Sequence, residues 1–511
     1  MILYREFIKT ALKMKDKIAV VDYSTKKETT YSQLLIASIL FSKKIKKFEE
    51  KNIGIMIPTS AGAYISVLAT QMAGKVPVMI NYSTGAIKNS LYAQYKCYFK
   101  TIITSKKLIA KLNIKPVSGM IYIEDIAATI TKSDKLLAFT KSKLPQRLLC
   151  GIFPKTKEED NAHILFTSGS EKDPKIVQLS HKNIGHNVKY IPPAFPLTGE
   201  DFFLGNLPLF HVFGLTVTFW LPIIMGSTIV AHVNPLDYKS IIKSIEEYPV
   251  SVLVGTPSFY HGYLRRSHEN TFKNIRVAIS GADKLPNQIR EDYKNRHNLD
   301  ILEGYGTTET SPVISSNTPL NQRAESIGKT LEGVSVKIIS IETDELLPPN
   351  RIGKILVKGD LVMKGYFGDI EETSLHIHND WYDTGDMGYL DEDGYLYHKG
   401  RLRRFVKIGG EMVSLAAVED EINKVLDDDN LCCVVEVPNP VKGADLVAAI
   451  TTHEINKRKI IKKISKNLPP ISIPKEFFLI DELPMMGSGK VNFREVEKIC
   501  RNMIKEKSKK K

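Results

Sequence analysis

Cysteine is scarce in this chain of 511 residues. The sequence has five, Cys97, Cys150, Cys432, Cys433 and Cys500, and no two of them form a C-x-x-C pair. A disulfide framework needs an even set and a cysteine zinc site needs closely spaced ligands, so neither is favoured. Few, odd-numbered thiols fit a protein of the reducing cytoplasm.

Long uninterrupted apolar runs are also missing. The N-terminus carries Arg5 and Glu6 and therefore lacks the apolar centre of a signal peptide. Residues 206–233 contain no Lys, Arg, Asp or Glu, but Pro208 and Pro222 interrupt them. A spanning helix needs about 20 mostly apolar residues. We therefore expect this stretch to be buried core or the wall of an acyl-binding pocket.

Acidic residues are fewer than basic ones. The chain has 71 Lys and Arg and 57 Asp and Glu, so the formal net charge is +14. A basic balance of this size suggests acidic partners, namely nucleic acid, anionic lipid or an acidic protein. The densest basic run is the C-terminal tail, residues 505–511. We interpret that tail as a solvated terminus, with attraction to a lipid surface as the alternative.

The length predicts two or more domains, and 43% hydrophobic with 25% charged residues is ordinary for a globular protein. An apolar strand at Ile53–Ile57, a helix at Ala61–Met72 and a strand at Val76–Ile80 indicate a βαβ unit. Alternation of this kind favours an α/β architecture with parallel sheets.

The last hundred residues mix both element types. We expect a helix at Val418–Leu426, strands at Cys432–Val437 and Leu446–Thr451, and a basic helix at Lys457–Lys466. This pattern predicts an α+β C-terminal domain.

Residues 165–175, LFTSGSEKDPK, place a hydroxyl-rich loop between two apolar strands. Such a loop can direct backbone N–H groups and hydroxyls toward phosphate oxygens. It does not match the G-x-x-x-x-G-K-[ST] phosphate loop. Taken alone, it is better explained as a polar hairpin.

Two later stretches add nucleotide chemistry. ILEGYGTTE at 301–309 offers an aromatic ring for a purine, hydroxyls for phosphate and a carboxylate for Mg²⁺. WYDTGD at 381–386 places a carboxylate at a glycine turn, where it could accept both ribose hydroxyls. His378 and Asp383 also form the H-x-x-x-x-D pattern of glycerolipid acyltransferases, but this context makes the match accidental, and no acyltransferase domain is predicted.

These stretches, in this order, resemble the adenylate-forming superfamily of acyl-CoA synthetases, luciferases and peptide-synthetase adenylation domains. Its signature loop reads approximately T-S-G-[ST]-T-G-x-P-K-G. The present loop departs from it at Glu171, Lys172 and Ile176. The resemblance to one branch of the superfamily, named below, extends from about residue 31 to about residue 498. The superfamily resemblance implies stacked α/β sheets in a large N-terminal domain, residues 1–400, and a small mobile lid domain, residues 401–511.

The resemblance also implies roles for individual residues. The ATP or AMP contacts would be Thr167, Ser168, Gly169, Ser170, Lys175, Gly281, Ala282, Tyr305, Gly306, Asp386 and Arg401. His211 and Gly214, in P-x-x-H-x-x-G, would border the carboxylate pocket. Thr308 would contact the α-phosphate, Glu309 would ligate Mg²⁺, and Arg403 would be the hinge. Lys490 would serve the first half-reaction and Lys407 the second.

Several stretches are most similar to the synthetase half of bacterial bifunctional 2-acylglycerophosphoethanolamine acyltransferase/acyl-acyl-carrier-protein synthetases. The similarity implies that ATP and Mg²⁺ activate a long-chain fatty acid to acyl-AMP. The acyl group would then pass to the phosphopantetheine thiol of acyl carrier protein, an acidic partner that suits the positive charge. The alternatives are a fatty acyl-CoA synthetase and a non-catalytic nucleotide- or acyl-binding protein. No nucleic-acid partner is expected, and a cytoplasmic location with peripheral association at the inner membrane stays open.

Overall fold

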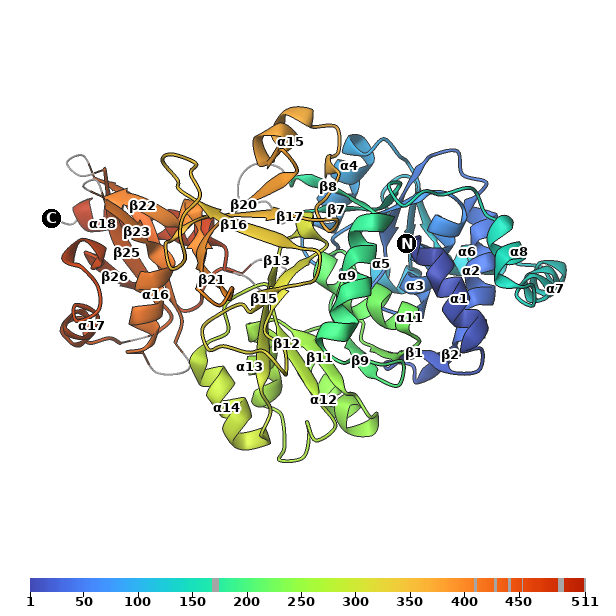
Figure 1. Ribbon diagram of the computed structural model, residues 1–511, viewed down its shortest axis with the longest axis horizontal. Helices are drawn as coiled ribbons and strands as arrows, with labels where there is room; N and C mark the ends of the chain where they lie inside the picture. Colours follow the sequence, from blue (N-terminus) through green and yellow to red (C-terminus); the bar gives the residue numbers. More distant parts are fainter. Residues whose placement is uncertain are drawn as a thin grey trace. The chain divides into compact units, whose positions relative to one another are not determined.

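The computed structural model describes residues 1–167, 174–408, 411–426, 430–439, 443–452, 454–485 and 491–509, and for Lys407, Ser508 and Lys509 it describes the backbone alone. The described chain forms two compact units (Figure 1). The larger unit comprises residues 1–167, 174–335 and 357–382, and the smaller unit comprises residues 336–356 and the described residues after 382. The domain boundary expected between residues 400 and 401 and the hinge expected at Arg403 remain predictions.

One sheet of the larger unit contains the predicted βαβ unit. Its strands follow the order β18 (Gly365–Tyr366), β8 (Ile176–Ser180), β7 (Asn161–Phe166), β4 (Val76–Met79), β3 (Asn52–Met56), β5 (Ile102–Thr104) and β6 (Met120–Tyr122). Strands β7, β4, β3, β5 and β6 are parallel, as the alternating pattern predicts. Strands β8 and β18 add antiparallel neighbours at one edge, since the loop after β7 returns the chain directly beside it.

The second sheet of the larger unit is parallel at its centre and antiparallel at both ends. Its order is β15 (Lys329–Thr330), β14 (Val313–Ser316), β13 (Ile301–Gly306), β12 (Val277–Ser280), β11 (Val252–Gly255), β9 (Phe202–Gly205), β10 (Thr228–Ala231), β1 (Ile18–Asp22) and β2 (Lys27–Thr30). Loops that follow parallel strands gather at one edge of a sheet, where ligands of α/β proteins bind.

Helices cover both sheets. In chain order they are α1 (Leu3–Lys13), α2 (Tyr31–Ile45), α3 (Ala61–Met72), α4 (Ala86–Lys96), α5 (Lys106–Leu112), α6 (Ile123–Ala128), α7 (Lys132–Lys141), α8 (Gln146–Gly151), α9 (His181–Ala194), α10 (Val212–Leu215), the π-helix η1 (Thr216–Trp220), α11 (Leu221–Met225), α12 (Tyr238–Glu247), α13 (Pro257–Leu264), α14 (Asn287–His297), the 3₁₀-helix η2 (Thr308–Thr310) and α15 (Ile370–His376). Helix α3 contacts β1 of one sheet and β3 and β4 of the other. Its buried face therefore joins the two sheets in one apolar core.

The charge-free stretch between residues 206 and 233 is mostly buried, with Val233 exposed at its end. It forms α10, η1, α11 and β10, and Phe219 stacks on Tyr64 of α3 with ring centroids 4.6 Å apart. Within the described part of the chain, no helix is both long enough and apolar enough to span a bilayer.

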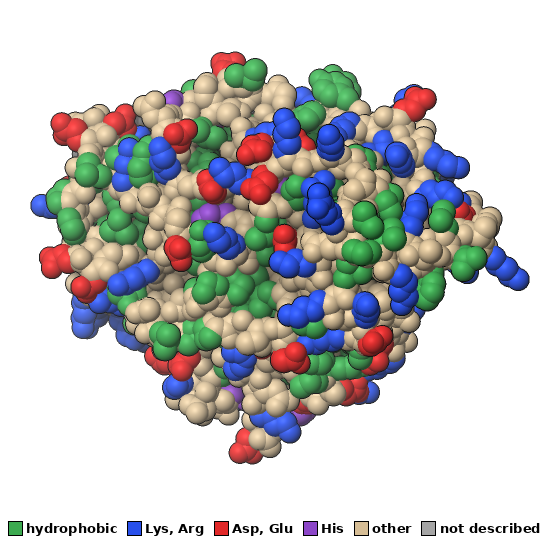
Figure 2. Space-filling model, turned by 45° about the vertical axis from the view of Figure 1, so that its right-hand side comes forward, with side chains coloured by type: hydrophobic (Ala, Val, Ile, Leu, Met, Phe, Trp, Pro, Cys, Tyr) green, Lys and Arg blue, Asp and Glu red, His purple; other side chains and the backbone are tan. Residues whose placement is uncertain are grey.

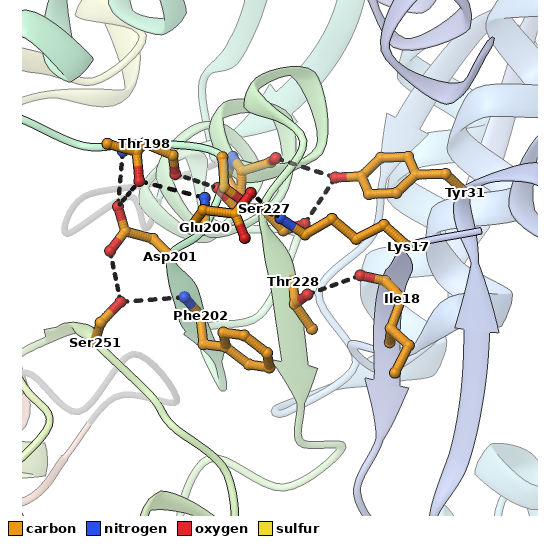
Figure 3. A network of polar contacts seen from close by, with 12 residues as sticks. Lys17, Ile18, Tyr31, Thr198, Glu200, Asp201, Phe202, Ser227, Thr228 and Ser251 are labelled. Atoms are coloured by element: carbon orange, nitrogen blue, oxygen red, sulfur yellow. Dashed lines mark hydrogen bonds and ion pairs between the residues drawn. The ribbon is translucent and has the colours of Figure 1, made fainter. Parts of the chain in front are cut away.

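A polar network holds the N-terminal strand against the second sheet (Figure 3). The Thr228 hydroxyl donates to the Ile18 carbonyl at 2.7 Å, and the Tyr31 hydroxyl donates to the Ser227 carbonyl at 2.7 Å. Asp201 accepts from the Thr198 amide at 2.7 Å and from the Ser251 hydroxyl at 2.6 Å. The network thereby connects β1, β9, β10 and the segment before β11.

The remaining elements lie in the smaller unit, apart from residues 335, 357–358, 377–378 and 381–382, which belong to the larger unit. They comprise β16 (Ser335–Ile339), β17 (Gly353–Lys358), β20 (Trp381–Leu390), β21 (Leu396–Arg401), η3 (Leu402–Arg404), β22 (Phe405–Ile408), β23 (Glu411–Ser414), α16 (Leu415–Asn423), β24 (Cys432–Asn439), β25 (Gly443–Ile450), α17 (Lys457–Ile464), η4 (Pro470–Ser472), β26 (Glu476–Leu479) and α18 (Phe493–Lys509), and β19 (Ile377–His378) pairs with the start of β20. The predicted helix at 418–426 in fact begins at Leu415, because the Ser414 hydroxyl caps it by accepting from the Ala417 amide.

Candidate active site

The base of the predicted phosphate loop is closed by reciprocal hydrogen bonds. The Thr167 amide donates to the Lys175 carbonyl at 2.9 Å, and the Lys175 amide donates to the Thr167 hydroxyl at 3.2 Å. These bonds continue the antiparallel pairing of β7 with β8, whose register places Phe166 opposite Ile176. The loop thus leaves and re-enters the sheet at adjacent points. Ser168, Gly169 and Ser170 lie outside the described residues.

The Lys175 ammonium lies among three side chains that sequence reasoning missed. It forms an ion pair with Glu372, lies 2.9 Å from His376 Nε2, and lies 5.0 Å from the ring centroid of Tyr366. The ion pair lowers the pKa of Glu372. These contacts hold the Lys175 ammonium in one place at the base of the loop.

Tyr366 also reaches the predicted magnesium ligand. Its hydroxyl donates to Glu309 Oε1 at 3.0 Å, and the Met363 amide donates to the Glu309 carbonyl at 2.7 Å. Burial, followed by the negative charge of Glu309, raises the pKa of Tyr366, so the phenol stays protonated and keeps donating. The carboxylate of Glu309 is consequently held in one orientation beside the phosphate loop.

Glu309 fits the role of a magnesium ligand. Mg²⁺ prefers oxygen ligands and usually takes one or two carboxylates together with the oxygens of a substrate phosphate. Glu309 is buried, and its partner at Oε1 is a neutral hydroxyl. Among the described residues no cluster of three acidic, His or Cys side chains could hold a metal by itself. The metal would therefore be bound together with the nucleotide.

Three predicted stretches meet around Phe213. Gly281 follows β12, and a Cβ atom there would lie 3.2 Å from the Phe213 ring and 3.5 Å from the Gly304 carbonyl. Phe213 lies between His211 and Gly214 in the chain. A Cβ on Gly214 would meet the Pro208 carbonyl at 2.4 Å, which explains the need for glycine there. The structure therefore brings the His211 stretch beside the expected adenine-binding turns.

Tyr305, Gly306 and Thr308 lie at the end of β13 and the start of η2. In the pairing of β13 with β14, Tyr305 lies opposite Ser315 and Gly306 opposite Val313, with an irregularity between them. Ala282 has a φ of 71°, which is rare for a residue with a side chain. Strained backbone of this kind is concentrated at binding sites.

Asp386 and Arg401 lie together in the smaller unit. They face each other in the β20–β21 pairing, and Arg401 Nε lies 3.3 Å from Asp386 Oδ1. His398 Nε2 lies 3.6 Å from the same oxygen. Asp386 is buried, whereas Arg401 is 61% exposed.

The remaining predicted residues belong to the hinge and to the two half-reactions. Arg403 is exposed in η3. Lys490 and the side chain of Lys407 lie outside the described residues.

Two family models match this chain. The family model described as "AMP-binding enzyme" matches residues 7–367, and the model of the "AMP-binding enzyme C-terminal domain" matches residues 430–490. The chain belongs to the AMP-binding enzyme family. As such it is an enzyme of the AMP-forming acid–thiol ligase type, in which acyl adenylation by ATP precedes thioester formation.

Several relatives of this AMP-binding enzyme match nearly its whole length. A long-chain-fatty-acid–CoA ligase of Bacillus subtilis is 26% identical, covering 94% of this chain and 91% of the relative. A 4-coumarate–CoA ligase of Petroselinum crispum is 24% identical, covering 94% and 90%. ATP-bound MatB from Rhodopseudomonas palustris shares the fold with a TM-score of 0.86 at 23% identity, covering 98% of this chain and 99% of that one. The stacked α/β fold with a smaller C-terminal part is thereby confirmed.

Proposed function

We propose that this AMP-binding enzyme activates a long-chain fatty acid with ATP and transfers the acyl group to a thiol. In the first step a carboxylate oxygen of the fatty acid bonds to the α-phosphorus of ATP, and the bond to pyrophosphate breaks. In the second step the thiol sulfur bonds to the acyl carbon and loses its proton, and AMP leaves. The observation that carries the proposal is the array formed by Thr167, Lys175, Tyr366 and Glu309.

The array would stabilise the negative charge that develops when the carboxylate approaches ATP in the first step. An anion must approach a polyanion, so preorganised positive charge and hydrogen-bond donors lower the barrier most. Lys175 supplies charge at the loop, and Glu309, oriented by Tyr366, would hold Mg²⁺ against the phosphates. When Mg²⁺ is bound it would neutralise phosphate charge. The family resemblance implies that Lys490 would contact the α-phosphate and that Asp386 with Arg401 would bind the ribose.

Two features support a fatty acid as the substrate. Relatives named long-chain-fatty-acid–CoA ligases are 26% identical to this chain. The stretch beside His211 is free of charged residues and folds into the core of the larger unit. Other relatives are named 4-coumarate–CoA ligases, so an aromatic acid is the necessary comparison in the assay.

Coenzyme A is the acceptor that the relatives' names support. Acyl carrier protein is a second candidate because α17 carries five exposed basic residues and no acidic one. They are Lys457, Arg458, Lys459, Lys462 and Lys463, while Ile460 and Ile464 are buried beneath them. An exposed basic helix of this kind is complementary to an acidic protein carrier.

The test supplies ATP, Mg²⁺ and labelled palmitate, and offers CoA or holo-acyl carrier protein in parallel. We expect release of pyrophosphate and label on CoA. Label on the carrier protein would assign the second acceptor, and K459E/K462E should then reduce that transfer and leave pyrophosphate release unchanged. Activation of 4-coumarate but not palmitate would overturn the fatty-acid assignment. Absence of any acyl-AMP would overturn the enzyme reaction itself.

A further inference from the structure

The segment that contains α7 and α8 exposes large apolar side chains on the surface of the larger unit. Leu136 is 68% exposed, Phe139 is 50% exposed and Leu148 is 59% exposed, and Leu137 and Ile152 are exposed as well. At about 3.6 residues per turn, Leu136 and Phe139 lie on the same side of α7. Exposed apolar side chains gathered in this way mark an interaction surface.

The opposite side of α7 is anchored to the protein. Ala138 is 3% exposed, and Asp134 accepts hydrogen bonds from Lys43 Nζ at 2.7 Å and Lys44 Nζ at 3.3 Å, both from α2. Leu149 of α8 is fully buried, and its burial anchors that helix. The exposed leucines and Phe139 therefore cannot turn inward without breaking these contacts. Their exposure is a consequence of how the helix is held.

The same segment is strongly basic. Between residues 131 and 157 the sequence has six Lys and one Arg against one Asp, and that Asp is Asp134, which Lys43 and Lys44 already neutralise. Lys132, Lys135 and Lys143 are exposed, and the Lys143 ammonium lies 4.9 Å from the Phe139 ring centroid. Figure 2 turns toward the viewer the side on which Figure 1 shows α7 and α8, and basic and hydrophobic side chains lie intermixed there.

We propose that the α7–α8 segment docks the enzyme on an anionic lipid surface. A helix that presents apolar side chains between lysines can insert the former at the headgroup boundary while the latter meet lipid phosphates. Lysine stems also reach over apolar surface while the ammonium stays in the polar layer. The occupant is lipid rather than an acidic protein, because exposed lysines and exposed large apolar side chains lie together on one segment, which matches anionic headgroups above an apolar layer.

The test is co-sedimentation of the full chain with vesicles of equal parts phosphatidylcholine and phosphatidylglycerol, against vesicles of phosphatidylcholine alone. We expect binding to the anionic vesicles that weakens with salt. L136S/F139S should reduce the partition constant at least tenfold. Each lysine near an anionic surface contributes roughly fivefold, so K132E/K135E/K143E should abolish binding.

Matched controls exclude general effects. L320S/L346S changes two exposed leucines elsewhere, and K27E/K239E/K273E changes three exposed lysines elsewhere; both should bind as the unchanged protein does. Removal of residues 505–511 should also leave binding intact. Pyrophosphate release with detergent-dispersed palmitate should be equal in all variants.

Two results would overturn the proposal. One is vesicle binding that survives both variants of the α7–α8 segment or that disappears when residues 505–511 are removed. The other is a dimer in sedimentation equilibrium that L136S/F139S dissociates, which would assign the surface to a second copy of the chain. Neither result would affect the proposed reaction, whose own failure would be the absence of acyl-AMP.

Discussion

At the scale of single residues, the site depends on a tyrosine that no motif identifies. Tyr366 donates to Glu309 and lies beneath the Lys175 ammonium. It is placed there because β18 pairs with β8 and sets Tyr366 opposite Val177, two positions after Lys175. A carboxylate that must receive a metal ion benefits from a fixed orientation, as the outer partners of metal ligands generally provide.

Tyr366→Phe tests this orienting role. The substitution keeps the ring over Lys175 and removes the hydroxyl that orients Glu309. Loss of an outer partner commonly costs about 10–100-fold in metal affinity or activity, so we expect at least tenfold more Mg²⁺ for half-maximal pyrophosphate release. Tyr389→Phe, which changes a tyrosine stacked on Tyr397, is the matched control. An unchanged Mg²⁺ requirement would contradict the assigned role.

At the scale of elements, close approaches of the backbone fix the turns around the site. Gly214 lets α10 begin against the Pro208 carbonyl, and the polar network around Asp201 joins β9 to its neighbours. The carbonyl near Gly214 comes from six positions earlier in the chain, whereas the partners of Asp201 include residues of distant segments, which the sequence alone does not indicate.

Gly214→Ala should destabilise the protein. Its Cβ would lie 2.4 Å from a backbone carbonyl oxygen, which cannot rotate away as a side chain could. Overpacking of this kind costs about 1–3 kcal/mol of unfolding free energy. Gly255→Ala is the matched control, because its Cβ would make an ordinary contact of 3.5 Å with the Tyr260 ring. Urea denaturation measures both; equal stability of the two variants would contradict the packing argument.

Asp201 makes stability depend on acid pH. Burial alone would raise its pKa, but hydrogen bonds from Arg276, Ser251 and the Thr198 amide outweigh burial and lower it. A lowered folded-state pKa means that the stabilisation is present above the unfolded value of about 3.9 and is lost as pH falls through the folded value.

Asp201→Asn should therefore lower the unfolding free energy at pH 7 by roughly 1.5–3 kcal/mol, the range for hydrogen bonds to a charged group. The difference from the unchanged protein should shrink as the pH falls below about 4. Asp300→Asn, at an exposed ion pair with Lys294, should have little effect at any pH. A deficit for Asp201→Asn that does not vary with pH would contradict the assigned charge.

At the scale of the whole molecule, two adjacent arginines of η3 have different expected roles. One stabilises the smaller unit, and the other is the predicted hinge. Arg404 pairs with Glu419 at 2.5 Å, donates to the Val434 carbonyl at 2.9 Å and lies over the Phe493 ring at 4.0 Å, so it holds the smaller unit together. Burial raises the pKa of Glu419 even though Arg404 opposes that shift. Arg403 is exposed beside it.

Arg404→Ala should lower the free energy of unfolding by about 3–5 kcal/mol, because it leaves the Glu419 carboxylate buried without its partner. Melting curves measure this loss.

Arg403→Pro should slow thioester formation more than adenylation, since a domain rotation between the half-reactions needs freedom at a hinge. Arg403→Ala is the control for simple loss of the side chain. Single-turnover rates of the two half-reactions, with melting curves, distinguish the variants. Equal slowing of both half-reactions by Arg403→Pro would refute the hinge.

The sequence by itself determined the family and the element types, and it predicts nucleotide contacts that remain proposals. This was possible because each signal is contiguous: Ala61–Met72 is a helix as predicted, and the stretches around Thr167, Glu309 and Asp386 each carry their chemistry within a few residues. Its error at Val418–Leu426 arose where one capping serine decided the helix start.

Only the tertiary structure decided which side chains share a site. Lys175 meets His376 across 201 positions of sequence, and Tyr366 meets Glu309 across 57. It also decided that one side of α7 is anchored by Lys43 and Lys44 while Leu136 and Phe139 remain exposed. The physical reason is that strand pairing and helix docking depend on the whole apolar core, so contacts between distant segments are set by packing and not by local pattern.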